Sequence, residues 1–292
     1  SNLLIGDDGF DGTVIKINTR GRDADVSSCS GAMLTLAAGE PWDDLVAETV
    51  EQGWSGLEAL SGIPGLVGAT PIQNVGAYGA EISHTLAGVR TYDRLLQQQK
   101  TFAVADCGFG YRWSRFKADP QRYVILSVTL QLPLADLSAP VRYAQLADTL
   151  GVEVGTRIDA CAVREAVLEL RRDKGMVTDL DDHDTWSAGS FFTNPIIDVD
   201  AAGRLPEAAP RFGQPDGRIK TSAAWLIEHA GFGKGYGTPP ATLSNKHTLA
   251  LTNRGGATAA DLLALAREIR AGVQDRFGIE LAPEPNLINC EL

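Results

Sequence analysis

The segment from Leu60 to Ile82 constrains the fold of this chain more than any other. Its sequence, LSGIPGLVGATPIQNVGAYGAEI, contains five glycines and two prolines, which are incompatible with one regular element of that length. Long irregular segments inside compact domains are usually functional loops or disordered. Glycines let backbone N–H groups approach phosphate oxygens, so the segment is either a pyrophosphate cradle or a structural Ω-type loop.

Regular elements surround this loop. Alternating or β-branched patterns predict strands at Thr13–Ile17, Gly31–Ala38 and Tyr123–Leu132. Start and stop signals predict helices from Pro41 to Gly53, from Asp159 to the basic run before Gly175, over Lys220–Ala230, and from Thr258 to Gly278. Because strands and helices do not alternate strictly, the fold class is predicted to be α+β. The acidic stretch Asp179–Asp184 is typical of a solvated linker at a domain boundary.

Charge and composition exclude several classes of partner. The chain has 37 acidic and 26 basic residues, a net charge of -11, which disfavours nucleic acid and anionic membrane surfaces. No apolar run approaches the roughly 20 residues that span a bilayer, and no signal-peptide pattern occurs at the start, so we expect a cytoplasmic protein. The four cysteines and four histidines lack metal-ligand spacing, so no metal site is expected.

Three residues could carry chemistry, although each has an ordinary structural explanation. Arg112 lies in the cationic stretch GYRWSRFK and offers a planar fork for a carboxylate or phosphate, or is a solvated strand-end charge. Ser190, in SAGSFFTNP, has a hydroxyl fixed on a turn that could donate a proton or could satisfy the local backbone. Glu284, between two prolines, is a rigid candidate acid or a surface carboxylate.

Five motifs in order, GIPGLVGATPIQNVGAYG, FGYRWSRFK, AGSFFTNP, AAWLIEHAGFGKG and APEPNLI, resemble the UDP-N-acetylenolpyruvylglucosamine reductases. The likeness spans nearly the whole chain, and the NVGAYG tyrosine loop resembles the type I branch. The resemblance implies a two-subdomain flavin-binding region of the vanillyl-alcohol-oxidase type and a separate α+β substrate-binding domain. It assigns 1–20 and 279–292 to a remnant of the first flavin subdomain, 21–178 to the second, and 185–278 to the substrate domain.

The resemblance also implies FAD as cofactor and NADPH as hydride donor. Its flavin contacts correspond to Ser1, Asn2, Leu3, Gly62, Ile63, Pro64, Gly65, Gly68, Ala69, Thr70, Pro71, Asn74, Gly76 and Gly79. In the family, Ser1–Leu3 end a glycine-rich flavin loop that follows a βα segment not contained in this sequence. Either that upstream part lies outside this sequence, or flavin binding is compromised.

The implied reaction reduces UDP-N-acetylglucosamine enolpyruvate to UDP-N-acetylmuramate in peptidoglycan precursor synthesis. Arg112 and protonated Glu284 would stabilise the enolate, and Ser190 would protonate its carbon. Family substrate contacts correspond to Tyr78, Tyr143, Arg171, Lys174, Asn194, Lys246 and His247.

Two rival functions stay open on sequence alone. The first is another FAD-dependent oxidoreductase with the same cofactor fold, and the second is a non-catalytic module that binds a UDP-sugar or flavin. We expect a monomer whose partner is a small-molecule substrate. The glycine-rich GFGKGYG at Gly231–Gly237 follows a predicted helix, so it is interpreted as a connector and not as a dinucleotide loop.

Overall fold

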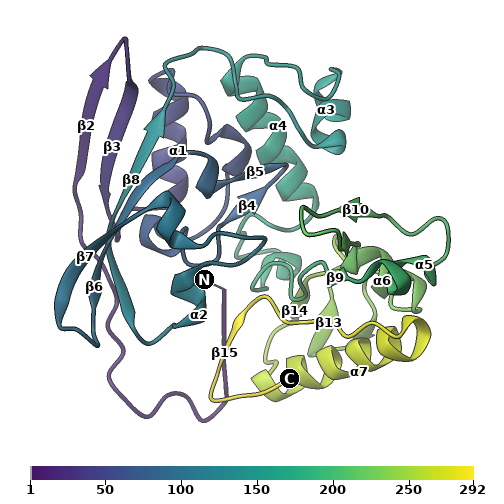
Figure 1. Cartoon of the computed structure of the whole chain (residues 1–292). Coiled ribbons are helices and arrows are strands. Elements are labelled where there is room, and N and C mark those ends of the chain that lie inside the picture. The colour runs from purple at the N-terminus through teal and green to yellow at the C-terminus, as the bar shows by residue number, and fades with distance from the viewer. Residues whose placement is uncertain (1) are drawn as a thin grey trace. The chain divides into compact units, whose positions relative to one another are not determined.

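The computed structural model describes residues 2–292 (Figure 1). Contacts divide the chain into two compact units. One unit contains Val14–Arg172, and the other contains the described residues up to Thr13 together with Asp173–Leu292. No helix in residues 2–292 has the length and apolar character required to span a bilayer.

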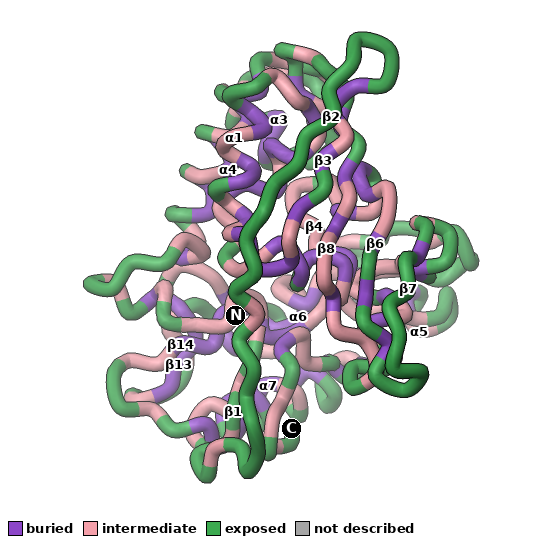
Figure 2. Tube along the Cα trace, turned by 90° about the vertical axis from the view of Figure 1, so that its left-hand side faces the viewer, coloured by how far each residue is buried: buried purple, intermediate pink, exposed green. Residues whose placement is uncertain are grey.

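The Val14–Arg172 unit is built on a five-stranded antiparallel sheet in the order β2-β3-β8-β6-β7. Its strands are β2 (Arg22–Ser27), β3 (Gly31–Ala37), β6 (Leu86–Asp93), β7 (Gln98–Ala103) and β8 (Tyr123–Leu132). The edge strand β2 is exposed along its length, whereas β3 alternates buried and more exposed residues (Figure 2). The predicted strands over 31–38 and 123–132 are therefore confirmed, since alternation marks a sheet with one buried face.

Helix α1 (Trp42–Glu51) covers this sheet by burying Trp42, Leu45 and Val46 in the same core as Leu34 and Leu36. Pro41 precedes the helix with extended backbone, and Gly53 follows it at φ 67°, as the sequence predicts. The other regular segments of this unit are α2 (Arg115–Ala118), α3 (Ala144–Leu150), α4 (Ala160–Asp173), the hairpin β4 (Gly76–Ala77) and β5 (Ala80–Glu81), and the 3₁₀ helices η1 (Glu58–Leu60), η2 (Val67–Ala69), η3 (Ile82–His84) and η4 (Val104–Cys107).

The second unit packs small sheets and helices around its own core. Parallel β1 (Leu3–Ile5) and β15 (Asn286–Ile288) form one sheet; β9 (Ile196–Ile197), β10 (Phe212–Gly213) and β11 (Ile219–Lys220) form another; β12 (Gly237–Thr238), β13 (Ala241–Leu243) and β14 (Leu251–Asn253) form a third. Its helices are η5 (His183–Thr185), α5 (Val199–Gly203), α6 (Ala223–His229) and α7 (Ala259–Phe277). Helix α7 lies against β13 and β14 (Figure 1).

The long helix α7 follows its sequence signals closely. Thr258 and Asp261 form the predicted capping box, and Gly278 ends the helix in the left-handed region at φ 69°. Buried Leu265, Ile269 and Val273 supply its apolar face. Mixed helices and strands in both units confirm the predicted α+β class.

Three local predictions were wrong. Thr13–Ile17 is not a strand: Val14 and Ile15 are 77% and 81% exposed, and the backbone makes no ladder there. Helix α6 begins at Ala223, because Ile219–Lys220 pairs as β11 and Ser222 caps the helix through Trp225 N–H. The acidic stretch 179–184 is not simply solvated, because Asp184 is buried.

Candidate active site

Ser190 and Glu284 lie on adjacent backbone segments of the second unit. The backbone of Phe191, the residue after Ser190, forms hydrogen bonds with two segments. Its N–H donates to the Leu249 carbonyl at 2.7 Å, and its carbonyl accepts the Glu284 N–H at 2.8 Å. Phe191 is buried, whereas Ser190 and Glu284 are half-buried. Backbone pairing therefore brings two predicted catalytic residues together although they are distant in the sequence.

Two predicted flavin contacts lie beside Glu284. The Asn2 side-chain amide donates to the Glu284 backbone carbonyl at 3.3 Å, and Leu3 is paired with Asn286 in the β1–β15 sheet. Asn2 has a left-handed backbone conformation, with φ 60°, directly before the chain enters β1 of that sheet. Ser1, the third predicted contact of this group, lies outside the described residues.

A cationic cluster forms around His247. Burial and, to a smaller extent, repulsion by the nearby Lys174 and Lys234 ammonium groups together lower the pKa of His247 to about 4. Lys174 and His247 were both predicted substrate contacts, and the structure brings them together. Lys234 was not among the predicted site residues, because GFGKGYG was interpreted only as a connector. The sequence feature that could have indicated it is a lysine placed between two glycines.

Asn194 and Lys246 are held by neighbouring groups. The Asn194 side-chain oxygen accepts the Ala223 N–H at 2.9 Å, at the start of α6. Lys246 Nζ donates to Asp182 at 2.6 Å, and this carboxylate raises the pKa of Lys246. Lys246 therefore anchors the acidic stretch, while His247 next to it lies in the cationic cluster.

The acidic stretch is bound to the loop between β13 and β14 and to Arg254, the residue that follows β14. Asp184 accepts the Asn245 N–H at 2.8 Å and forms an ion pair with Arg254. Burial alone would raise the pKa of Asp184, but hydrogen bonds from Arg254 and Asn245 outweigh it and lower the pKa. Asp184 lies between Lys174 and Ser190 in the sequence, so these contacts hold the segment that connects the two residues.

The glycine-rich loop has an outer part around Gly62–Gly65, where the backbone is exposed, and an inner part around Gly68, which is packed against the protein. Gly62 and Gly65 have φ 69° and 121°, and with Pro64 they remain at least partly exposed. A Cβ on Gly68 would approach Ala38 Cβ at 2.5 Å, so only glycine allows this contact. The exposed, side-chain-poor backbone fits a pyrophosphate cofactor, for which N–H groups are the natural donors.

The predicted flavin contacts therefore divide into two groups. Gly62, Ile63, Pro64, Gly65, Ala69, Gly76 and Gly79 retain exposed surface, whereas Gly68, Thr70, Pro71 and Asn74 are buried. Thr70 Oγ1 donates to the Val67 carbonyl at 2.8 Å, which holds the turn from within. Asp43 of α1 anchors the start of the loop by accepting the Gly62 N–H at 2.6 Å and an ion pair from Arg164.

Arg112 is positioned by the second half of the same loop. Its guanidinium donates to the Gly76 carbonyl at 2.8 Å and lies 5.3 Å from the Tyr111 ring centre. Asn74 connects the two segments by donating to the Gly110 carbonyl at 3.1 Å and to Glu81 at 2.7 Å. The left-handed φ of Arg112, 52°, is sustained by these contacts.

Tyr78, Tyr143 and Arg171 converge in the Val14–Arg172 unit. The tyrosine rings meet edge to face, with centres 5.6 Å apart. Burial raises the pKa of Tyr78, so its hydroxyl stays protonated, and burial lowers the pKa of Arg171 although Tyr78 and Asp43 partly oppose this. Three predicted substrate contacts from separate segments thus form a cluster of hydrogen-bond donors suited to an anionic ligand.

Comparison with known proteins identifies the family. Residues 181–288 match the model of the UDP-N-acetylenolpyruvoylglucosamine reductase C-terminal domain, and residues 1–95 match an FAD binding domain. A crystal structure of UDP-N-acetylenolpyruvylglucosamine reductase from Thermus caldophilus is similar, with a TM-score of 0.59 and 25% identity over 87% of this chain and 72% of that one.

Curated relatives are more similar in sequence. The UDP-N-acetylenolpyruvoylglucosamine reductase of Cutibacterium acnes is 59% identical over 100% of this chain and 78% of its own length. That of Streptomyces coelicolor is 58% identical, again over 100% and 78%. The chain belongs to the UDP-N-acetylenolpyruvoylglucosamine reductase family.

Proposed function

We propose that this chain is a flavoenzyme that reduces UDP-N-acetylglucosamine enolpyruvate to UDP-N-acetylmuramate, with FAD as cofactor and NADPH as hydride donor. The observation that carries the proposal is the backbone pairing that places Glu284 beside the Ser190 segment. Family membership and the matched FAD binding domain support the same reaction and disfavour a non-catalytic module. The cytoplasmic location and monomeric state stay predictions.

The outer part of the glycine-rich loop would hold FAD through backbone N–H groups. Asn2 and Leu3, at the start of β1, stay predicted flavin contacts. Bound FAD, once reduced by NADPH, would supply the hydride for the enolpyruvyl group. Asp43 would keep Gly62 oriented, because its carboxylate accepts the Gly62 N–H. Gly68 would keep the loop close to the sheet, since its backbone N–H donates to the Ala38 carbonyl at 2.9 Å.

The catalytic residues have complementary roles. Arg112 supplies a positive charge for the carboxylate-bearing enolate, and its contact with Gly76 fixes the direction of the guanidinium. Glu284, in its protonated form, would donate a hydrogen bond to negative charge that develops on the substrate. Ser190 donates a proton to the carbon that becomes the new C–H centre, as a general acid held on a backbone that is paired on both sides.

The substrate contacts would recognise the UDP moiety. Lys174, Lys234 and neutral His247 provide donors for a diphosphate, and Tyr78, Tyr143 and Arg171 provide a second group. Lys246 is engaged by Asp182, so its contribution would be to hold His247 in place. Asn194 would position the segment after Ser190 through its bond to Ala223.

The decisive experiment records the visible flavin spectrum anaerobically while NADPH and then UDP-N-acetylglucosamine enolpyruvate are added. Bleaching by NADPH followed by recovery with the enolpyruvyl compound is the expected result. A flavin that bleaches but never recovers would indicate another flavin-dependent oxidoreductase. Binding of the UDP-sugar without any flavin signal would indicate a module that only binds ligands.

A further inference from the structure

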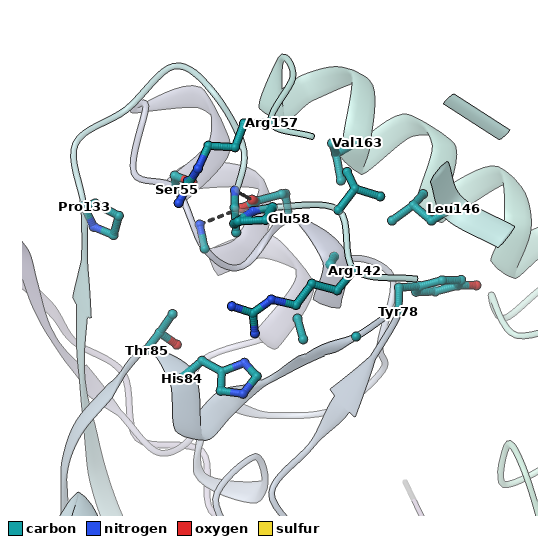
Figure 3. Close-up of a pocket in the computed structure, with 17 residues that line it drawn as sticks. Ser55, Glu58, Tyr78, His84, Thr85, Pro133, Arg142, Leu146, Arg157 and Val163 are labelled. Atoms are coloured by element: carbon teal, nitrogen blue, oxygen red, sulfur yellow. Dashed lines mark hydrogen bonds between the residues drawn. The ribbon is translucent and has the colours of Figure 1, made fainter. Parts of the chain in front are cut away.

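A cavity of about 200 Å³ opens in the Val14–Arg172 unit behind the tyrosine loop (Figure 3). Its inner wall is largely apolar and includes Val141, Leu146 and Val163. Arg142, Arg157 and His84 provide cationic or hydrogen-bonding groups at its more exposed side. The cavity therefore combines an apolar floor with a polar rim, as small-molecule sites do.

The rim favours an anion although the chain carries a net charge of -11. Glu58 is the buried carboxylate in the wall, and its two oxygens accept backbone N–H groups of Gly56 and Ala139. Those bonds stabilise the Glu58 charge internally. The His84 Nδ1 accepts the Glu81 N–H at 3.3 Å, so in the neutral ring the proton lies on Nε2, which is then a donor.

Arg142 faces this cavity and not the tyrosine pair. Tyr143, the next residue, has extended backbone with φ -108° and ψ 121°, so neighbouring side chains point to opposite sides. Figure 3 shows the Arg142 guanidinium directed toward His84, with the Tyr78 hydroxyl pointing away from it. The cavity is therefore distinct from the ring contact between Tyr78 and Tyr143, although Tyr78 and Gly79 contribute to the cavity wall.

We propose that this cavity binds a small organic carboxylate, with its acid group between Arg142 and His84 and its body against the apolar wall. A bound ligand would restrict the motion of Arg142 and Tyr143 relative to the tyrosine loop that contains Tyr78. If the proposed function holds, the occupant also lowers the KM for the UDP-sugar by preorganising the tyrosine pair.

The test uses isothermal titration calorimetry of the full chain with 3-hydroxybenzoate as probe, beside 3-hydroxybenzamide, benzoate and inorganic phosphate. We expect the carboxylate to bind and Arg142→Gln to weaken it about tenfold or more, since a charge-assisted bond is lost. Arg90→Gln is the matched control, because Arg90 is exposed on β6 and bonds Gln99 outside the cavity.

Three results would overturn the site: no binding of 3-hydroxybenzoate, equal binding of its neutral amide, or equal losses in the Arg142 and Arg90 variants. Phosphate binding as tightly as the carboxylate would overturn the assigned ligand class. These titrations need no turnover, so they are independent of the proposed reaction. An unchanged KM in the presence of saturating 3-hydroxybenzoate, in enzyme that completes both half-reactions, would overturn the link to the tyrosine pair.

Discussion

Glu284 donates its backbone N–H to the carbonyl of Phe191 at 2.8 Å, one residue after Ser190. The bond belongs to the main chain, so it does not depend on either side chain proposed to act in catalysis. Substitutions at 190 or 284 can therefore remove a chemical group while the backbone pairing that positions it survives.

Ser190→Ala should lower the rate of enolpyruvyl reduction by about a hundredfold to ten-thousandfold, because a general acid is removed. Flavin reduction by NADPH should be unchanged, since Ser190 is assigned to the later proton transfer. Anaerobic stopped-flow absorbance separates the two half-reactions. Ser27→Ala, at an exposed serine of edge strand β2, is the control. Equal losses in both half-reactions would refute the assigned role.

Tyr78→Phe should raise the KM for the UDP-sugar about tenfold, because a protonated, half-buried hydroxyl donor is lost while the ring contact with Tyr143 is kept. Steady-state kinetics with NADPH saturating measures the change. Tyr92→Phe removes a hydroxyl from an exposed tyrosine on β6 and should leave KM unaltered. A Tyr78 variant with normal KM would exclude this hydroxyl from substrate binding.

Gly68→Ala should reduce the flavin content of the purified protein. The added methyl would lie 2.5 Å from Ala38 Cβ and 3.0 Å from the Ala38 carbonyl oxygen, so the loop must move away from β3. Absorbance of the bound flavin relative to protein gives the readout. Gly203→Ala adds the same methyl where no atom lies within 4 Å and should retain full flavin. Full flavin in both variants would contradict the packing argument.

Stability should fall as the pH is lowered from about 6.5 toward about 4 because of His247. Its native pKa of about 4 lies below the ordinary value of 6.5, so the unfolded chain binds the proton more tightly. The stabilisation is complete above 6.5 and is lost as the pH falls through 4, up to about 3 kcal/mol. Urea unfolding across this range should show the loss, and His247→Gln should flatten it. An equally steep dependence in the variant would rule out His247 as the source.

Asp184→Asn should destabilise the second unit by about 1–2 kcal/mol, because it leaves the partly buried Arg254 without its carboxylate partner. The lowered pKa of Asp184 means that its contribution is present above its ordinary value of 3.8 and is lost as the pH falls below it. Denaturant unfolding at neutral pH measures the difference. Asp181→Asn, an exposed neighbour in the same stretch, should change it little; equal effects would indicate a general charge effect.

Local signals in the sequence predicted β3, β8, α1, α4, α6 and α7, and the family resemblance supplied most of the candidate site residues. Alternation gave β3 and β8, and Thr258, Asp261 and Gly278 bounded α7, because these rules act between residues close in the chain. Thr13–Ile17 shows the limit of such rules. Its β-branched residues favour a strand, but strand formation also requires a neighbouring ladder.

Tertiary structure alone decided which distant segments meet. Pairing through Phe191 joins Ser190 to Glu284, and folding brings Lys234 toward Lys174 and His247. Neither follows from spacing, because contacts between distant segments depend on how separate elements pack. The acidic stretch 179–184 illustrates the same point: its composition predicts solvation, but Arg254 and Asn245 compensate the burial of Asp184. The sequence thus determined the chemical groups, and packing determined their environment.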